Sequence, residues 1–170
     1  LLTAQAFDLE SINAIGCDGT RHGAGAHSKM GIPTITLPGT IDNDLAYTDF
    51  SIGFDTAVNG VLTELIKVRD TMVSHDRIGI VEVMGNKCGD IALHAGVAGS
   101  ADFILLPAME FDIDVICDQL IKNNIRNRKT SMIVLAEGAG QGDKMAGYIR
   151  EKTKLEEKNV VLGYTQRHGS

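Results

Sequence analysis

The chain has 170 residues, a net charge of −6 and 44% hydrophobic residues. This length fits one domain or a piece of a larger one, and the composition excludes a disordered chain and disfavours binding to nucleic acid, because net negative charge repels phosphate. No apolar run approaches the roughly 18 residues that span a bilayer, and the first residues lack the charged region of a secretory signal, so we expect neither a membrane partner nor export.

Apolar runs rich in Ile, Val and Leu alternate along the chain with segments of helical periodicity. A first helix is predicted to end near Lys29, and the other predicted helices are Gly53–His75, Asp90–Gly99 and Asp112–Asn123. The predicted strands are Ile32–Leu37, Ile78–Val83, Asp102–Leu106 and Met132–Ala136. Nearly continuous hydrophobicity is typical of strands that are covered on both faces, and the alternation indicates an α/β fold with a mostly parallel sheet.

Ligands bind such folds in the loops that follow the carboxyl ends of strands. The first such loop is Gly16–Thr20, which precedes the first predicted helix. Free backbone amides at a helix start favour an anion such as phosphate, and Asp18 in this loop is a candidate magnesium ligand. A tight turn with Asp18 as a helix cap is the alternative interpretation.

The second loop, Pro38–Asp44, carries two carboxylates, Asp42 and Asp44. Two carboxylates this close can take different roles, so one can face a substrate while the other binds a metal or caps a helix. Phosphoryl transfer needs such a carboxylate, together with a metal that neutralises phosphate. Tyr47 stands where a calcium-binding EF-hand requires glycine, so calcium is not expected. An acidic surface turn remains the alternative.

Three later glycine-containing loops are further candidates, and each is also explained by a structural turn. They are Val83–Asp90, in which Asp90 is a candidate N-cap, Glu137–Gly140 and Leu162–Ser170. Three cysteines without a CxxC pair, and five histidines without zinc-binding spacing, favour neither a disulfide framework nor a zinc site. We therefore expect a reducing, cytoplasmic setting.

Together these loops resemble ATP-dependent 6-phosphofructokinase of the bacterial type. The resemblance rests on segments that keep the order and spacing of that family, namely Gly16–Thr20, Pro38–Asp44, Asp49–Ala57, Val81–Asp90, Ala136–Glu137 and Val161–Ser170. It implies a three-layer, parallel-sheet phosphofructokinase-like fold in which two lobes face a cleft. It also implies that this chain is an internal fragment in which both lobes are incomplete, with residues of about 1–50 from the ATP-binding lobe and about 51–170 mainly from the sugar-phosphate-binding lobe.

The resemblance implies transfer of the γ-phosphoryl group of ATP to the 1-hydroxyl of D-fructose 6-phosphate, a step of glycolysis that needs Mg²⁺. Asp42 is then the catalytic base, Thr40 stabilises the transferred group, and Asp18 ligates magnesium with support from Asp44. The expected ATP-binding residues are Cys17, Asp18, Gly19, Thr20 and Gly23. The expected substrate-binding residues are Thr40, Asp42, Asp44, Arg77, Met84, Gly85, Glu137, Lys158, Tyr164 and Arg167.

The resemblance also implies a homotetramer, in which Arg77 reaches the active site of a neighbouring subunit. A second set of residues resembles the family's effector site for ADP or phosphoenolpyruvate, namely Arg69, Asp102, Arg126 and Arg128. A solvated basic helix end is the alternative interpretation of that set.

Glycine at positions 19 and 39 favours ATP as the donor, because the pyrophosphate-dependent branch of the family carries an acidic residue and a lysine at these positions. The chain departs from the family's pattern at Cys17, Asn86, Lys158, Tyr164 and His168. Two alternatives therefore stay open, a pyrophosphate-dependent phosphofructokinase and a catalytically silent subunit that binds nucleotide or sugar phosphate.

Overall fold

The computed structural model describes residue 3 and residues 6–168. Gly169 and Ser170, the last residues of the Val161–Ser170 motif, lie outside the described residues. Within the described part of the chain, each helix is too short or too polar to cross a membrane.

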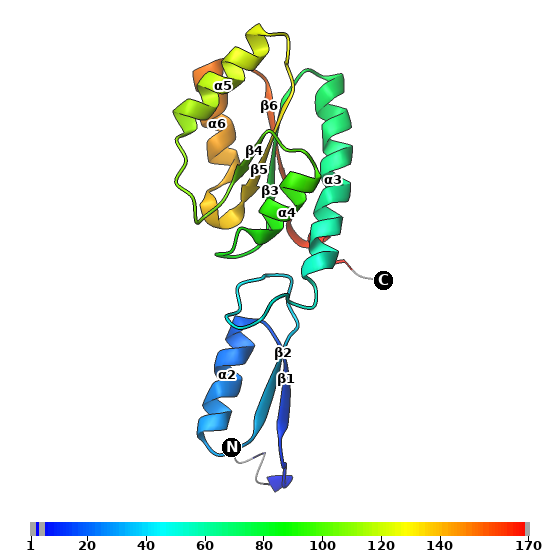
Figure 1. Ribbon diagram of the computed structural model, residues 1–170, viewed down its shortest axis with the longest axis vertical. Helices are drawn as coiled ribbons and strands as arrows, with labels where there is room; N and C mark the ends of the chain where they lie inside the picture. Colours follow the sequence, from blue (N-terminus) through cyan, green and yellow to red (C-terminus); the bar gives the residue numbers. More distant parts are fainter. Residues whose placement is uncertain (1–2, 4–5, 169–170) are drawn as a thin grey trace.

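The first group of elements is a small parallel sheet with one helix, drawn in blue in Figure 1. Strands β1 (Ile12–Gly16) and β2 (Thr34–Pro38) pair in parallel, and α2 (Asp18–Lys29) connects them. Strand β1 was not among the predicted strands, because its five residues include the polar Asn13 and leave only a short apolar run. Strand β2 begins two residues later than predicted, and the carbonyl of Pro33 there accepts a hydrogen bond from the amide of Ile12.

The second group of elements is a four-stranded sheet in the order β4-β5-β3-β6, in which all neighbours are parallel. Its strands are β3 (Ile78–Val83), β4 (Phe103–Leu105), β5 (Ser131–Ala136) and β6 (Glu157–Val161). Its helices are α3 (Phe54–Ser74), α4 (Asp90–Ala98), α5 (Ile113–Ile125) and α6 (Gly142–Thr153). Two short 3₁₀ turns complete the group, η1 (Glu137–Ala139) and η2 (Gly163–Gln166).

Helices cover both faces of the larger sheet, which gives three layers (Figure 1). One hydrophobic core joins the sheet to α3 and α4, and a second core joins it to α5 and α6. All six residues of β5 are buried, as their unbroken hydrophobicity predicts. The prediction of an α/β fold with parallel strands is confirmed.

Most element boundaries agree with the prediction to within two residues, but α6 and β6 were missed. Helix α6 buries apolar side chains on a narrow stripe of Met145, Ala146 and Ile149, too short a pattern to stand out as a periodic segment. Strand β6 begins with two charged residues, and its first, Glu157, is buried in an ion pair with Arg150. Hydrophobicity does not predict the burial of a charged residue that pairs with an arginine from another element.

Candidate active site

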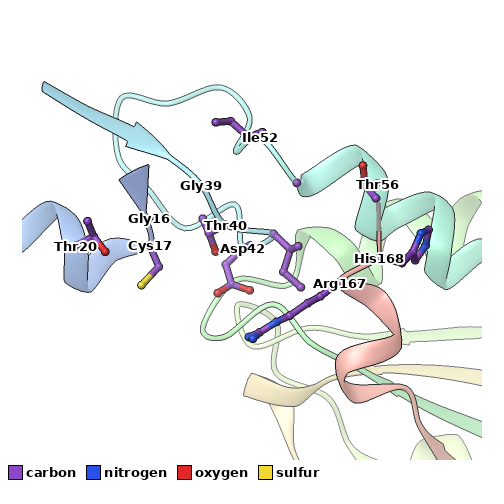
Figure 2. A pocket seen from close by; sticks show the side chains of 12 residues that line it. Gly16, Cys17, Thr20, Gly39, Thr40, Asp42, Ile52, Thr56, Arg167 and His168 are labelled. Carbon is purple, nitrogen blue, oxygen red and sulfur yellow. Dashed lines mark hydrogen bonds between the residues drawn. The ribbon is translucent and has the colours of Figure 1, made fainter. Parts of the chain in front are cut away.

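A cavity of about 720 Å³ opens where the loops of the small sheet meet α3 and the end of the chain (Figure 2). Four segments line it, and each follows a strand or begins a helix. The lining residues are Gly16, Cys17, Thr20, Gly39, Thr40, Ile41, Asp42, Ile52, Gly53, Thr56, Arg167 and His168. The cavity thus joins three of the loops in which the sequence predicted a ligand.

The loop after β2 carries Asp42 into the cavity. The amide of Gly39 donates to the carbonyl of Leu37 (2.8 Å), and the amide of Asp42 donates to Thr40 Oγ1 (3.2 Å), which makes a tight turn. A Cβ atom on Gly39 would lie 2.7 Å from Ile15 Cγ2 and 3.3 Å from the amide nitrogen of Gly16. Glycine at position 39 therefore lets the loops after β1 and β2 approach each other closely.

The environment of Asp42 favours its protonated form. Its Oδ1 atom is buried and has no hydrogen-bond partner among the described residues. Burial raises the pKa of this carboxyl above its ordinary value, and the charges of Asp44 and Glu137 raise it further, while Arg167 acts in the opposite direction. A carboxyl group with a raised pKa in a cavity has the properties of a general base.

Asn43 holds the Asp42 loop in place, a role that the sequence did not reveal. Its Nδ2 atom donates to Asp90 Oδ2 (2.9 Å), and its Oδ1 atom accepts from the amide of Ser51 (3.2 Å). Its carbonyl accepts from Cys88 Sγ (3.4 Å). The suggestion that Asp90 is an N-cap is wrong, because Gly89 occupies that position and Asp90 is the first helical residue of α4.

The loop after β3 is fixed by carboxylates from two other loops. Glu137 Oε1 accepts from the amides of Gly85 (3.0 Å) and Asn86 (2.6 Å), and Asn86 Nδ2 donates to Asp44 Oδ2 (2.9 Å). Gly85 has a φ of 147°, and a Cβ there would lie 2.6 Å from the carbonyl oxygen of Cys88. The predicted substrate residues Asp44, Gly85 and Glu137 are therefore brought together.

The 3₁₀ turn η2 is attached to the same loop through Gln166. This side chain is 1% exposed, and its Oε1 atom accepts from the amide of Met84 (3.2 Å) while its Nε2 atom donates to the carbonyl of Gly163 (3.0 Å). The guanidinium of Arg167 lies over the ring of Tyr164, 5.1 Å from its centroid. Tyr164 also lines a small cavity of about 120 Å³ with Met84 and Glu137. The sequence marked Arg167 as functional but gave no sign of the anchoring role of Gln166.

The start of α2 provides amides and a carboxylate beside the main cavity. Cys17 is the N-cap, so the suggestion that Asp18 caps this helix is wrong, and Asp18 lies in the first turn. Backbone hydrogen bonds at Thr20 and Gly19 lower the pKa of the exposed Cys17 thiol. Gly19 and Thr20 lie in the same turn, and Gly23 follows one turn later with no atom within 4 Å of a Cβ built on it.

Asp18 is held by two basic neighbours. Arg21 Nη2 lies 2.8 Å from Asp18 Oδ1, and His22 Nδ1 lies 3.3 Å from Oδ2. The Arg21 hydrogen bond lowers the pKa of Asp18, and the charges of His22 and Lys87 lower it further. Within the described residues, no three His, Cys, Asp or Glu side chains form a metal-binding group. One carboxylate beside the free amides of a helix start still fits Mg²⁺, which proteins commonly bind with few side chains plus substrate phosphates.

Arg77 and Lys158 lie away from the Asp42 cavity. Arg77 precedes β3, and Lys158 pairs with Gly79 in β6, so both lie at the amino ends of their strands. They line a separate cavity of about 410 Å³, in which Arg77 Nε lies 2.8 Å from Glu156 Oε2. Within one copy of the chain, these two predicted substrate residues do not join the others.

Three of the four predicted effector residues lie around the start of β4. Arg69 of α3 donates to the carbonyl oxygens of Gly99 and Ser100, the latter at 2.9 Å. Arg128 pairs with Asp102, whose Oδ2 atom also accepts from the amide of Met132 (2.8 Å). The fourth residue, Arg126, is the C-cap of α5.

Comparisons of the sequence with family models and with curated proteins agree on one family. A family model described as phosphofructokinase matches residues 2–170. ATP-dependent 6-phosphofructokinases from two strains of Clostridium botulinum, Hall and Alaska E43, are 49% and 47% identical to the chain and cover 98% and 97% of it. The chain spans about half of the length of these relatives, 52% in both cases.

Solved structures of phosphofructokinases share the fold. The phosphofructokinase of Saccharomyces cerevisiae matches with a TM-score of 0.79 and 29% identity, over 95% of this chain and 26% of the yeast chain. A pyrophosphate-dependent phosphofructokinase from Marinobacter aquaeolei matches with a TM-score of 0.81 and 24% identity, over 98% of this chain and 47% of that one. At that identity, the second match shows the fold alone.

Proposed function

Because the chain belongs to the phosphofructokinase family, we propose that the protein containing it is an ATP-dependent 6-phosphofructokinase. It transfers the γ-phosphoryl group of ATP to the 1-hydroxyl of D-fructose 6-phosphate and releases ADP and fructose 1,6-bisphosphate. The observation that carries this proposal is the position of Asp42. This carboxyl group, with its raised pKa, lines one cavity with the start of α2 and with Arg167.

Different residues of this chain have different roles in the proposed reaction. Asp42 accepts the proton of the 1-hydroxyl as its oxygen attacks the γ-phosphorus. Thr40 stabilises the transferred phosphoryl group, and the amides at the start of α2 hold the phosphates of ATP. Arg167 binds the 6-phosphate, for which a planar guanidinium is suited.

Asp18 is the residue that would hold Mg²⁺, which when bound neutralises charge on the donor phosphates. The sugar is bound by Met84 and Gly85 of the loop after β3 and by Glu137, whose Oε1 atom accepts a hydrogen bond from the amide of Gly85. Residues of about 1–50 then belong to the ATP-binding lobe, and residues of about 51–170 mainly to the sugar-phosphate-binding lobe.

Arg77 and Lys158 complete the sugar-phosphate site of a neighbouring copy, which requires an oligomer, and we propose a homotetramer. Their position away from the Asp42 cavity supports this assignment. Arg69, Asp102, Arg126 and Arg128 form an effector site for ADP or phosphoenolpyruvate. We place the enzyme in the cytoplasm, where it catalyses a step of glycolysis.

The space around Gly39 supports ATP rather than pyrophosphate as the donor. A side chain at this position would meet Ile15 and the backbone of Gly16, so the loops after β1 and β2 could not keep their present separation. The lysine of the pyrophosphate-dependent branch would therefore require the side chain of Ile15 to move.

The test is an assay of the full protein that contains this chain, with fructose 6-phosphate, Mg²⁺ and either ATP or pyrophosphate. Turnover with ATP alone, lost in Asp42→Ser, is the expected result. Turnover with pyrophosphate alone would assign the protein to the other branch. Binding of both substrates without turnover would identify a silent subunit, and either outcome overturns the proposal.

A further inference from the structure

The missing side chain of Gly60 leaves a notch on helix α3, and the imidazole of His168 occupies this notch. Gly60 is buried, and it is the only glycine in the 21 residues of this helix. A Cβ atom built on Gly60 would lie 2.2 Å from His168 Nε2 and 2.9 Å from His168 Cδ2. The imidazole therefore occupies the space that any larger residue at position 60 would take, and glycine is otherwise unfavourable inside a helix.

This contact lies beside the candidate active site. Thr56 is one helical turn before Gly60, on the same face of α3, and both Thr56 and His168 line the main cavity. The turn η2 packs against α3. Figure 2 shows His168 turned against α3, while Arg167 extends the other way, toward Asp42.

Arg167 is thus held from both sides along the chain. The preceding residue, Gln166, is buried and bonded to the amide of Met84 and the carbonyl of Gly163. The following residue, His168, is exposed on its outer side and packs the Nε2 edge of its ring against Gly60. Contacts on both neighbours restrict the backbone at Arg167, so less backbone freedom is lost when the arginine binds an anion, and its affinity for that anion is higher.

We propose that His168 is a positioning residue, which through its contact with Gly60 fixes Arg167 over the cavity for the phosphate group of the sugar substrate. This inference rests on the proposed function for the identity of that substrate. His168 itself need not touch the substrate. Its contribution is to the geometry of Arg167, so its loss weakens sugar-phosphate binding and leaves nucleotide binding unchanged.

The kinetic experiment is a double-mutant cycle in the full protein that contains this chain. Gly60→Ala places a methyl group in the notch and displaces the imidazole, and His168→Gly removes the imidazole altogether. We expect each change to raise KM for fructose 6-phosphate about three- to tenfold, with kcat and KM for ATP within about twofold of the parent. In Gly60→Ala/His168→Gly the increase equals that of His168→Gly alone, because the added methyl group then meets nothing.

Gly147→Ala is the matched control. Gly147 also lies within a helix, α6, and a Cβ atom there has no neighbour within 4 Å. We expect this variant to keep the parental KM values. Two results would overturn the proposal. One is an increase in KM for fructose 6-phosphate in Gly60→Ala/His168→Gly that equals the product of the two single increases, and the other is a Gly60→Ala variant with the parental KM.

A second readout separates this inference from the proposed function. Diethyl pyrocarbonate modifies accessible imidazole nitrogens, and mass spectrometry gives the rate at each histidine. The ring of His168 is exposed, but its Nε2 atom faces Gly60, so Gly60→Ala is expected to accelerate modification at that nitrogen and to leave the exposed His22, which lies far from the substitution in sequence, unchanged. If the parent protein has no phosphofructokinase activity, the proposed function fails, while these rates still decide whether His168 sits in the notch. Equal rates at His168 in parent and variant refute the contact.

Discussion

Replacing Asp42 with asparagine should lower kcat and raise the free energy of unfolding. Asparagine keeps the shape of the side chain and the turn that depends on the amide of residue 42 and Thr40 Oγ1. It removes the group that we propose accepts the proton. General-base catalysis contributes about 10²–10⁴-fold, so kcat should fall by that factor, or by about 3–5 kcal/mol in activation free energy. KM for both substrates should change little, because the cavity keeps its lining.

The same substitution should stabilise the fold above pH 4. Burial and the charges of Asp44 and Glu137 raise the pKa of Asp42, so the folded state binds this proton more tightly than the unfolded state does. The ionised carboxylate therefore destabilises the fold increasingly as the pH rises from the ordinary pKa through the raised one. Because the side chain is only half-buried, solvent screens this effect, and we expect a gain of about 0.5–1 kcal/mol at neutral pH.

The measurement combines steady-state kinetics with urea denaturation of parent and variant at pH 4 and pH 7. The difference in unfolding free energy should be small at the lower pH and reach its full value at the higher one. A variant that keeps more than a tenth of the parental kcat would refute the role of Asp42 as the base. A variant that is less stable than the parent at pH 7 would refute the electrostatic account of its environment.

Two further substitutions or modifications test the surroundings of the cavity. Gln166→Leu leaves the amide of Met84 without its partner in the folded state, so unfolding in urea should show a loss of about 2–3 kcal/mol; a change below about 0.5 kcal/mol would contradict the anchoring role. Cys17 is exposed and its thiol pKa is lowered, whereas burial raises the pKa of Cys88 and Cys117. Iodoacetamide at pH 7 should therefore alkylate Cys17 first, with ATP slowing the reaction, and mass spectrometry would reveal any other order.

The parts of the fold that were predictable are those in which one local signal decides the structure. Strand β3 coincides with its predicted range, because unbroken burial leaves unbroken hydrophobicity in the sequence. Helix α3 was found from apolar residues on one face over many turns. Strand β6 was missed because Glu157 is buried through a partner, Arg150, on another element. Local periodicity contains no information about such a partner.

The candidate site divides in the same way. The sequence marked Asp42 and Gly39, because turn glycines and paired carboxylates are recognisable by type and spacing, whereas Arg167 was marked only through the resemblance to phosphofructokinases. It could not predict the bond from Asn43 to Asp90, which spans 47 positions, or the bond from Asn86 to Asp44, which spans 42. Both contacts join the loop after β2 in the small sheet to residues that follow β3 in the larger sheet, so they depend on how the two sheets pack, which local sequence patterns do not encode.

The strand order of the larger sheet also has a consequence for synthesis in the cell. Strand β3 occupies an inner position, yet both of its neighbours, β5 and β6, are translated after it. A ribosome adds about 5–20 residues per second. The backbone edges of the apolar strand Ile78–Val83 therefore stay unpaired for several seconds while the chain grows to Val161. During that interval the nascent chain exposes unpaired N–H and C=O groups of β3, which are a template for aggregation.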